Sequence, residues 1–146
     1  MMQFESLGFV EAEQAIAAGI AAARGLKKAM AFAVADHTGE MIATARMDGA
    51  NPRILRHSIR KAYTAALMCR HTLSFKRDLE ERNGALDQWG DLELTTLPGG
   101  LAVQTNGKFV GGVGAGGGGP DDEAVARAMV EAMGFQVAED SRAGRG

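Results

Sequence analysis

The sequence predicts an α/β fold of the α+β kind, in which helices cover the faces of an antiparallel sheet. Two observations lead to this prediction. Apolar residues recur at helical spacing near both ends of the chain, and two pairs of short apolar runs, each joined by a tight turn, lie between them. Consecutive hairpins favour antiparallel pairing, and the strand-helix-strand repeat of a parallel sheet is absent from the pattern.

Length and charge set broad limits on the protein. The 146 residues suffice for one compact domain, and we expect residues 1–140 to form it, with 141–146 as a disordered tail. The 16 basic and 18 acidic side chains give a net charge of -2, which argues against binding to nucleic acid or to an anionic membrane. Residues 1–24 contain no continuous apolar run, so neither a signal peptide nor a membrane span is predicted, and a cytoplasmic location is expected.

The first part of the chain is predicted to form a helix followed by a hairpin. Apolar residues at three- and four-residue spacing mark a helix from about residue 7 to residue 24, and Gly25 is a natural end for it. The apolar runs 29–36 and 40–47 flank the turn-like segment His37-Thr38-Gly39. This arrangement predicts a β-hairpin.

A second helix is predicted to begin at Asn51-Pro52 and to run to about His71. Asparagine caps free backbone N–H groups, and the fixed φ of proline suits the first helical position. A helical wheel groups the apolar side chains Leu55, Ile59, Ala62, Tyr63 and Ala66 on one face. The opposite, polar face carries Arg53, His57, Arg60, Thr64 and His71.

The rest of the chain repeats the pattern with shorter elements. The turn-forming pair Asn106-Gly107 favours a tight hairpin, and an irregular connection that carries Trp89 precedes it. The predicted elements are a helix from Ser74 to Asn83, strands over 101–105 and 108–113, and a final helix from Pro120 to about Met133.

The glycine-rich segment 114–119 leads into the final helix. It does not match the phosphate-binding P-loop pattern, and the acidic residues 121–123 at the start of the helix would repel a phosphate. One interpretation is that the glycines let backbones pass closely, while the acids stabilise the helix dipole. The other is that N–H groups of the segment line a pocket.

Two groups of polar residues are candidates for ligand binding. Arg46, Asp48 and Gly49 lie where a strand leaves the sheet, so Arg46 and Asp48 either face a ligand or pair with each other and fix the turn. The second group would hold a carboxylate, or would simply be a solvated helix face, and consists of Arg53, His57, Arg60, Lys61 and Thr64.

The histidines do not predict a metal site. His37, His57 and His71 match no metal-binding spacing, alone or together with Cys69. His57 or His71 could each ligate a haem iron singly, although the chain has no CxxCH attachment motif.

Several short motifs together resemble a known family in order and spacing. They are Val34-Ala-Asp36, Gly39, Arg46-Met-Asp-Gly-Ala50, Lys61-Ala-Tyr-Thr-Ala65, Leu97-Pro-Gly-Gly100 and Gly111-Gly-Val-Gly114. The chain resembles the GlcG/HbpS-like proteins, a family of haem-degrading domains that also occurs at the C-terminus of some corrinoid adenosyltransferases. The resemblance covers about Phe9 to Met133.

The resemblance implies a profilin-like α-β-α sandwich, with a five-stranded antiparallel sheet flanked by helices, and it implies a homo-oligomer. The family includes haem binders and small proteins encoded among catabolic genes, so fold-level kinship leaves the function open. Members commonly carry Gly-Val-Ser-Gly where this chain has Gly114-Ala-Gly-Gly117. A role for that serine is therefore not expected here.

Three functions follow as hypotheses. The first is a small-molecule-binding protein whose ligand is haem or a related tetrapyrrole. The second is an enzyme acting on a small carboxylated or aromatic metabolite, with Asp48, His57 or Asp122 as the candidates for proton transfer. The third is a non-catalytic, oligomeric accessory subunit. The candidate ligand-binding residues are Arg46, Asp48, Gly49, Arg60, Lys61, Thr64, Gly99, Gly100 and Gly114.

Overall fold

The structure is a computed structural model that describes residues 1–137. Its helices are α1 (Phe9–Gly25), α2 (Pro52–Met68), α3 (Thr72–Glu81) and α4 (Asp122–Ala132). Its strands are β1 (Ala31–Asp36), β2 (Met41–Arg46), β3 (Gly100–Thr105), β4 (Lys108–Gly116) and β5 (Gln136–Val137). Two short 3-10 turns, Leu86–Trp89 and Gly119–Asp121, precede β3 and α4 respectively.

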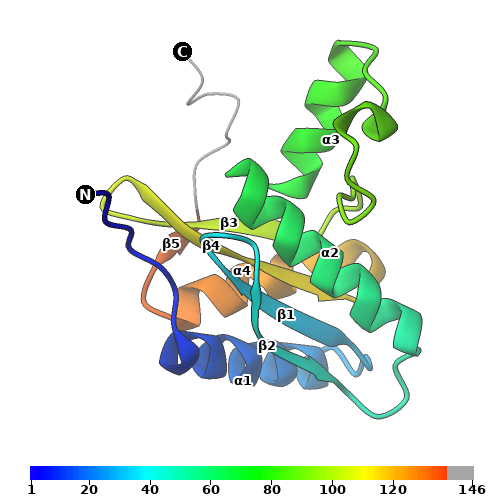
Figure 1. Ribbon diagram of the computed structural model, residues 1–146. Helices are drawn as coiled ribbons and strands as arrows, with labels where there is room; N and C mark the ends of the chain where they lie inside the picture. Colours follow the sequence, from blue (N-terminus) through cyan, green and yellow to red (C-terminus); the bar gives the residue numbers. More distant parts are fainter. Residues whose placement is uncertain (138–146) are drawn as a thin grey trace.

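The strands form one antiparallel sheet in the order β2-β1-β4-β3-β5. Each hairpin pairs within itself, and the strands β1 and β4 join the two hairpins at the centre of the sheet. Helices α1 and α4 cover one face and α2 covers the other, while α3 stands away from the sheet (Figure 1). The predicted α+β fold, with helices flanking a five-stranded antiparallel sheet, is therefore confirmed.

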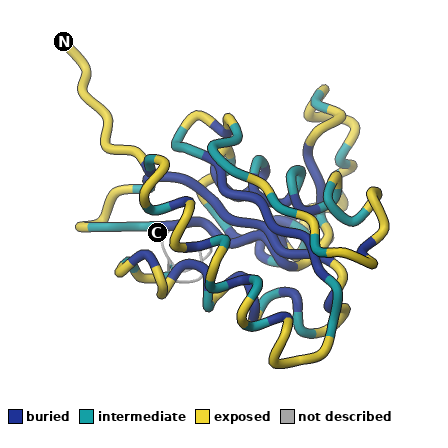
Figure 2. Tube along the Cα trace, turned by 90° about the horizontal axis from the view of Figure 1, so that it is seen from below, coloured by how far each residue is buried: buried dark blue, intermediate teal, exposed yellow. Residues whose placement is uncertain are grey.

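The two faces of the sheet carry side chains of different size. Side chains alternate between the faces along a strand. Phe32 and Val34 of β1 join the main core beneath α1 and α4, whereas Ala33 and Ala35 contact Ala62 of α2. The buried positions follow the sheet through the middle of the molecule (Figure 2). Helix α2 therefore rests on a surface of small side chains.

Glycines of β4 make the contact with α2 closer still. A Cβ added to Gly112 would lie 2.6 Å from the Ala62 carbonyl oxygen, and one added to Gly114 would lie 2.2 Å from the Ser58 carbonyl oxygen. Non-bonded atoms do not approach so closely, so only glycine lets the helix backbone rest on the strand backbone. This confirms, for β4, the interpretation that glycines allow backbones to pass closely.

Helix α2 is shorter than the sequence predicts. It ends at Met68, because Cys69 adopts a left-handed conformation with φ of 51° that ends the helix. His71 therefore does not lie on α2 and instead occupies the position just before α3, without a capping hydrogen bond from its side chain. That helix begins at Thr72, two positions before the predicted cap Ser74.

The predicted faces of α2 also need correction. Thr64, assigned to the polar face, is fully buried, and Lys61 is only 3% exposed. The larger residues Leu55 and Ile59, assigned to the apolar face, are half-buried at the flanks. The small-residue surface beneath the helix has no room for Leu55 or Ile59, whereas Thr64 and Lys61 are buried because the segment before β3 packs over them.

The remaining differences concern the ends of elements. Strand β4 continues to Gly116 instead of ending at Val113, and the short strand β5 was not predicted. Within residues 1–137, no helix is long and apolar enough to span a membrane. The predicted tail, 141–146, lies outside the described residues.

Candidate functional site

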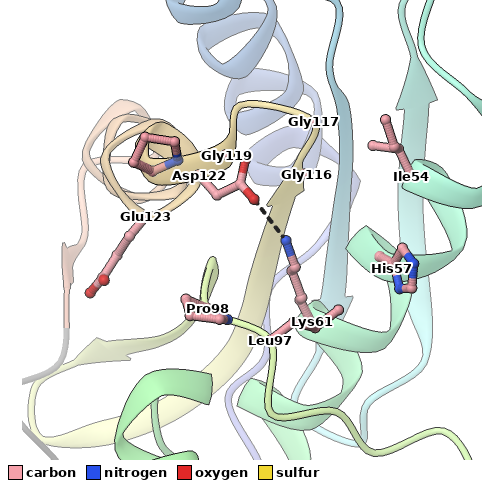
Figure 3. A pocket seen from close by; sticks show the side chains of 11 residues that line it. Ile54, His57, Lys61, Leu97, Pro98, Gly116, Gly117, Gly119, Asp122 and Glu123 are labelled. Carbon is pink, nitrogen blue, oxygen red and sulfur yellow. Dashed lines mark hydrogen bonds and ion pairs between the residues drawn. The ribbon is translucent and has the colours of Figure 1, made fainter.

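A cavity of about 430 Å³ lies where β4 leads into α4 (Figure 3). Three segments form its walls: helix α2, the loop before β3, and the segment between β4 and α4. Its lining residues are Ile54, His57, Lys61, Leu97, Pro98, Gly116, Gly117, Gly119, Pro120, Asp122 and Glu123. Three candidates from the sequence, His57, Lys61 and Asp122, are therefore brought together here.

A buried ion pair crosses the inner end of this cavity. Lys61 Nζ donates to Asp122 Oδ2 at 3.0 Å and to the Ala115 carbonyl oxygen at 2.8 Å. Asp122 Oδ1 accepts the Gly118 N–H at 2.7 Å. The two charged side chains are only 4% and 12% exposed. Because Asp122 opens α4, its carboxylate also faces the positive end of the helix dipole.

The predicted glycines Gly99, Gly100 and Gly114 lie around Lys61 and are not among the residues that line the cavity. A Cβ on Gly99, which has φ of +114°, would lie 2.7 Å from the Ala115 carbonyl oxygen and 3.1 Å from Lys61 Nζ. A Cβ on Gly100 would lie 2.6 Å from the Lys61 carbonyl oxygen. The geometry of Gly99, Gly100 and Gly114 is thus explained by the space that Lys61 and its helix need.

His57 lies one turn before Lys61 on α2 and is half-buried in the cavity wall. Burial lowers the pKa of His57, and the positive charges of Lys61, Arg53 and Arg60 lower it further. The imidazole is therefore neutral near neutral pH. A neutral imidazole has the free nitrogen lone pair with which histidine accepts a proton or binds a metal.

Lys28, which does not line the cavity, contacts the segment between β4 and α4. Lys28 Nζ donates to the Gly118 carbonyl oxygen at 2.8 Å and pairs with Asp121 Oδ2 at 2.7 Å. Gly117 and Gly119 have φ of 93° and 60°, values that glycine adopts without strain. These conformations turn the segment so that Gly117 and Gly119 line the cavity, while the Gly118 carbonyl faces Lys28.

Three further candidates lie at the turn after β2 and do not line the cavity. Arg46 Nη1 donates to the Ala50 carbonyl oxygen at 3.0 Å. Arg46 therefore braces its own turn, and the partner that the structure gives it is Ala50 instead of Asp48. Asp48 and Gly49 are exposed in the same turn.

Arg60 and Thr64 contact the irregular segment before β3. Arg60 Nε lies 3.4 Å from Glu93 Oε2, in a pair whose side chains are 41% and 58% exposed. Thr64 Oγ1 accepts the Thr95 N–H at 3.0 Å in a buried contact. Thr64 thus fastens the segment to α2 and is not one of the residues that line the cavity.

The other histidines lie elsewhere in the fold. His71 is buried, and its Nδ1 accepts the Ala102 N–H at 3.1 Å. His37 stacks on Phe4 with ring centroids 5.0 Å apart. Of the three histidines in the chain, only His57 lines the cavity. Among residues 1–137, no three histidine, cysteine, aspartate or glutamate side chains are grouped so that they could hold a metal ion.

Sequence reasoning missed several residues of the site. Ile54, Leu97 and Pro98 supply its apolar walls, and Glu123 lies across the cavity from Ile54 and His57 (Figure 3). Leu97 and Pro98 belong to a motif that carries the family resemblance, but no binding role was predicted for them. Lys28 carries no sequence signal, because its partners are remote in the chain.

The chain matches known proteins over most of its length. The family model described as "Haem degrading protein HbpS-like" matches residues 7–131. Protein GlcG of Escherichia coli strain K12 is 36% identical over 99 residues, which are 68% of this chain and 72% of that protein.

Solved structures agree with this relationship. The PduOC–haem complex superposes with a TM-score of 0.81 at 25% identity, covering 92% of this chain and 99% of that chain. A double mutant of Streptomyces reticuli HbpS gives 0.81 at 29% identity, covering 90% and 89%. Klebsiella pneumoniae protein ORFY, at 23% identity, shares the fold with a TM-score of 0.84 and coverage of 92% and 94%. The chain therefore belongs to the family of HbpS-like haem-degrading proteins.

Proposed function

We propose that this protein binds haem or a related tetrapyrrole in the cavity, with His57 as the ligand of the iron. The observation that carries the proposal is the position of His57, the one histidine of the chain that lines the cavity, where it is kept neutral by burial and by neighbouring positive charge. A neutral imidazole is a common axial ligand of haem iron. The PduOC–haem complex, a structural relative, supports the same ligand class.

The walls of the cavity suit a flat, apolar ring. Ile54, Leu97 and Pro98 provide apolar contacts, and the glycines of the opposite wall present flat backbone. The volume of about 430 Å³ lies within the range of small-molecule sites. When bound, haem would supply redox and oxygen chemistry of its own, and the protein would supply binding, orientation and electrostatics.

Charges around the cavity favour one orientation for a ligand with carboxylates. Helix α2 contains no acidic residue, and Arg53 and Arg60 flank His57 along it at helical spacing. The wall formed by the start of α4 carries Asp122 and Glu123. Carboxylates of a tetrapyrrole would therefore point toward α2, because like charges at α4 repel them.

A second candidate function is proton transfer on a small carboxylated or aromatic metabolite. It is favoured by one observation, the presence of the neutral His57 beside the buried Lys61–Asp122 pair in one cavity. A general base needs such a proton acceptor near a group that binds the substrate. Thermal-shift screening against organic acids should then show saturable stabilisation, because a ligand bound to the native state stabilises it.

The primary test is a haemin titration of the purified protein followed by absorbance. We expect a saturable shift of the Soret band in the wild-type protein and in the control variant His37→Ala, whose ring lies away from the cavity. The variant His57→Ala should lose the shift while keeping the far-UV circular dichroism of the wild type. A wild-type protein without a Soret shift would contradict haem binding. An unchanged shift in His57→Ala would contradict the assignment of the iron ligand.

A further inference from the structure

The segment from Gly116 to Asp121 has one side that lines the cavity and another that packs against the body of the protein. Gly116, Gly117 and Gly119 line the cavity, whereas Gly118 is turned away from it. A Cβ on Gly118 would lie 2.9 Å from Met30 Cε and 3.0 Å from Asp122 Oδ1, so this residue sits against the body of the protein. Gly118 therefore contacts the body of the protein on the side of the segment that faces away from the cavity.

Two lysines hold this segment from different places in the fold. Lys61 binds the Ala115 carbonyl oxygen just before the segment, on the cavity side. Lys28, in the connection between α1 and β1, binds the Gly118 carbonyl oxygen and Asp121. The carbonyl of Gly118 thus accepts from Lys28 and from the Asp121 N–H at 3.2 Å, and the Gly118 N–H donates to Asp122 at 2.7 Å. One peptide group on each side of Gly118 is held by a charged side chain.

The segment needs these contacts because its own backbone is permissive. Gly117 and Gly119 adopt positive φ, and a Cβ on Gly119 would meet nothing within 4 Å. Glycine pays the largest entropy cost on ordering, and no side chain packs at Gly119 to offset it. The pairing of Gly116 with Ala31 fixes the start of the wall, and the polar contacts that reach Gly118 and Asp121 fix its further course.

We propose that Lys28 is a positioning residue for the ligand cavity, acting through the Gly118 carbonyl and Asp121 to fix the glycine wall. This inference rests on the proposed function for the identity of the ligand. That Lys28 fixes the segment 116–121 can be tested in the protein without ligand. The Lys28 and Asp121 side chains are 35% and 38% exposed, so solvent screens the pair. Its loss should cost about fivefold in ligand affinity, the upper range for a partly exposed pair.

The chain offers a matched control one position away. Lys27 is exposed, and its φ of 57° is positive. The variants Lys28→Met and Lys27→Met remove the same charge, and methionine retains the Cβ and the stem, so neither introduces a new backbone restriction. Lys28→Arg retains the charge and the donors and serves as the conservative variant.

Two measurements test the proposal on the full chain. The first is amide hydrogen exchange of residues 116–121 in the ligand-free protein, and the second is the affinity for haemin. For Lys28→Met we expect faster exchange in this segment alone and about fivefold weaker haemin binding. For Lys27→Met we expect wild-type behaviour in both, and for Lys28→Arg we expect values close to wild type.

Three outcomes would overturn the proposal. In the first, Lys28→Met exchanges like the wild type. In the second, its exchange accelerates across the whole core, which would make Lys28 a general stabiliser. In the third, exchange rises in the segment but haemin affinity equals that of the wild type, which would show that the order of the glycine wall does not affect binding. If the wild-type protein fails to bind haemin, the proposed function fails, while the exchange data still decide whether Lys28 fixes the wall.

Discussion

Lys61 Nζ lies 3.0 Å from Asp122 Oδ2, and this ion pair joins the helix on one face of the sheet to the start of a helix on the other face. Its side chains are 4% and 12% exposed. Removing one partner of a buried pair leaves an uncompensated charge, and the pair is therefore a structural support as well as part of the cavity wall.

The first prediction concerns this ion pair. Lys61→Met should lower the free energy of unfolding by about 3 kcal/mol, since it strands the Asp122 carboxylate. The double variant Lys61→Met/Asp122→Asn should lose less than the sum of the two single variants, because no unpaired charge remains. Urea unfolding measures both. Arg60→Gln, which breaks the exposed pair with Glu93, is the control and should cost less than about 1 kcal/mol. Strict additivity in the double variant would contradict the coupling.

A second prediction concerns the contact of β4 with α2. Gly114→Ala should destabilise the protein by about 3 kcal/mol, because its new Cβ would lie 2.2 Å from the Ser58 carbonyl oxygen and force the backbones apart. Gly25→Ala provides the comparison, since a Cβ there meets nothing within 4 Å at the end of α1. It should be neutral or stabilising by about 0.5 kcal/mol. Thermal unfolding distinguishes the two, and equal melting temperatures would disprove the close contact.

The third prediction uses the only tyrosine of the chain. The Tyr63 hydroxyl donates to Asp91 Oδ2 at 2.6 Å, and this hydrogen bond, with burial and nearby negative charge, raises the pKa of Tyr63 to about 12 from the usual 10.0. The unfolded chain ionises first as the pH rises, so this contribution to stability is complete below about pH 10 and is lost toward about pH 12.

Absorbance of the phenolate checks the raised pKa directly. In the native protein the phenolate signal should be nearly absent at about pH 10, where an ordinary tyrosine is half ionised. In Asp91→Asn the midpoint should fall toward the ordinary value, because the negative charge that opposes ionisation is gone. A wild-type midpoint near 10 would rule out the hydrogen bond with Asp91 in solution.

The fourth prediction concerns the orientation of a bound tetrapyrrole. Haemin should bind more tightly than its dimethyl ester, because only the free acid carries carboxylates that meet the positive flank of α2. Arg53→Gln should reduce this preference by about threefold. Arg56→Gln removes the same charge from the same helix, but Arg56 is not among the charges that lower the pKa of His57, so it should change little. Equal effects of Arg53→Gln and Arg56→Gln would indicate that the positive charge of α2 attracts the carboxylates in general, without a specific contact to Arg53.

Much of the architecture could be predicted from local patterns. Helical spacing located α1 and α4, and the turn residues of both hairpins located the central strands, because these signals depend only on neighbours in the chain. The end of α2 could not be found this way. Helices usually end in the left-handed conformation at glycine, so Cys69 gave no signal of an end, and the predicted helix ran on to His71.

The site was only partly predictable for a related reason. His57, Lys61 and Asp122 were candidates because charged or titratable groups stand out in a sequence. Arg46 stood out for the same reason, but in the structure it donates to the Ala50 carbonyl oxygen in its own turn and does not line the cavity. A stronger signal was the alternation of small residues, Ala31-Ala33-Ala35 on one strand and Gly112-Gly114-Gly116 on its neighbour, which predicts a face that accepts a closely packed helix.

That alternation restricts how the protein could be retargeted to another ligand. Beneath α2, a single added methyl group would meet backbone atoms, so the surface that supports the helix of His57 and Lys61 cannot be altered by substitution at Gly112 or Gly114. The rim is different, since Leu97 is 43% exposed and faces no such limit. Mutant libraries aimed at new specificity should therefore vary Leu97 and Ile54, and leave the glycines of β4 untouched.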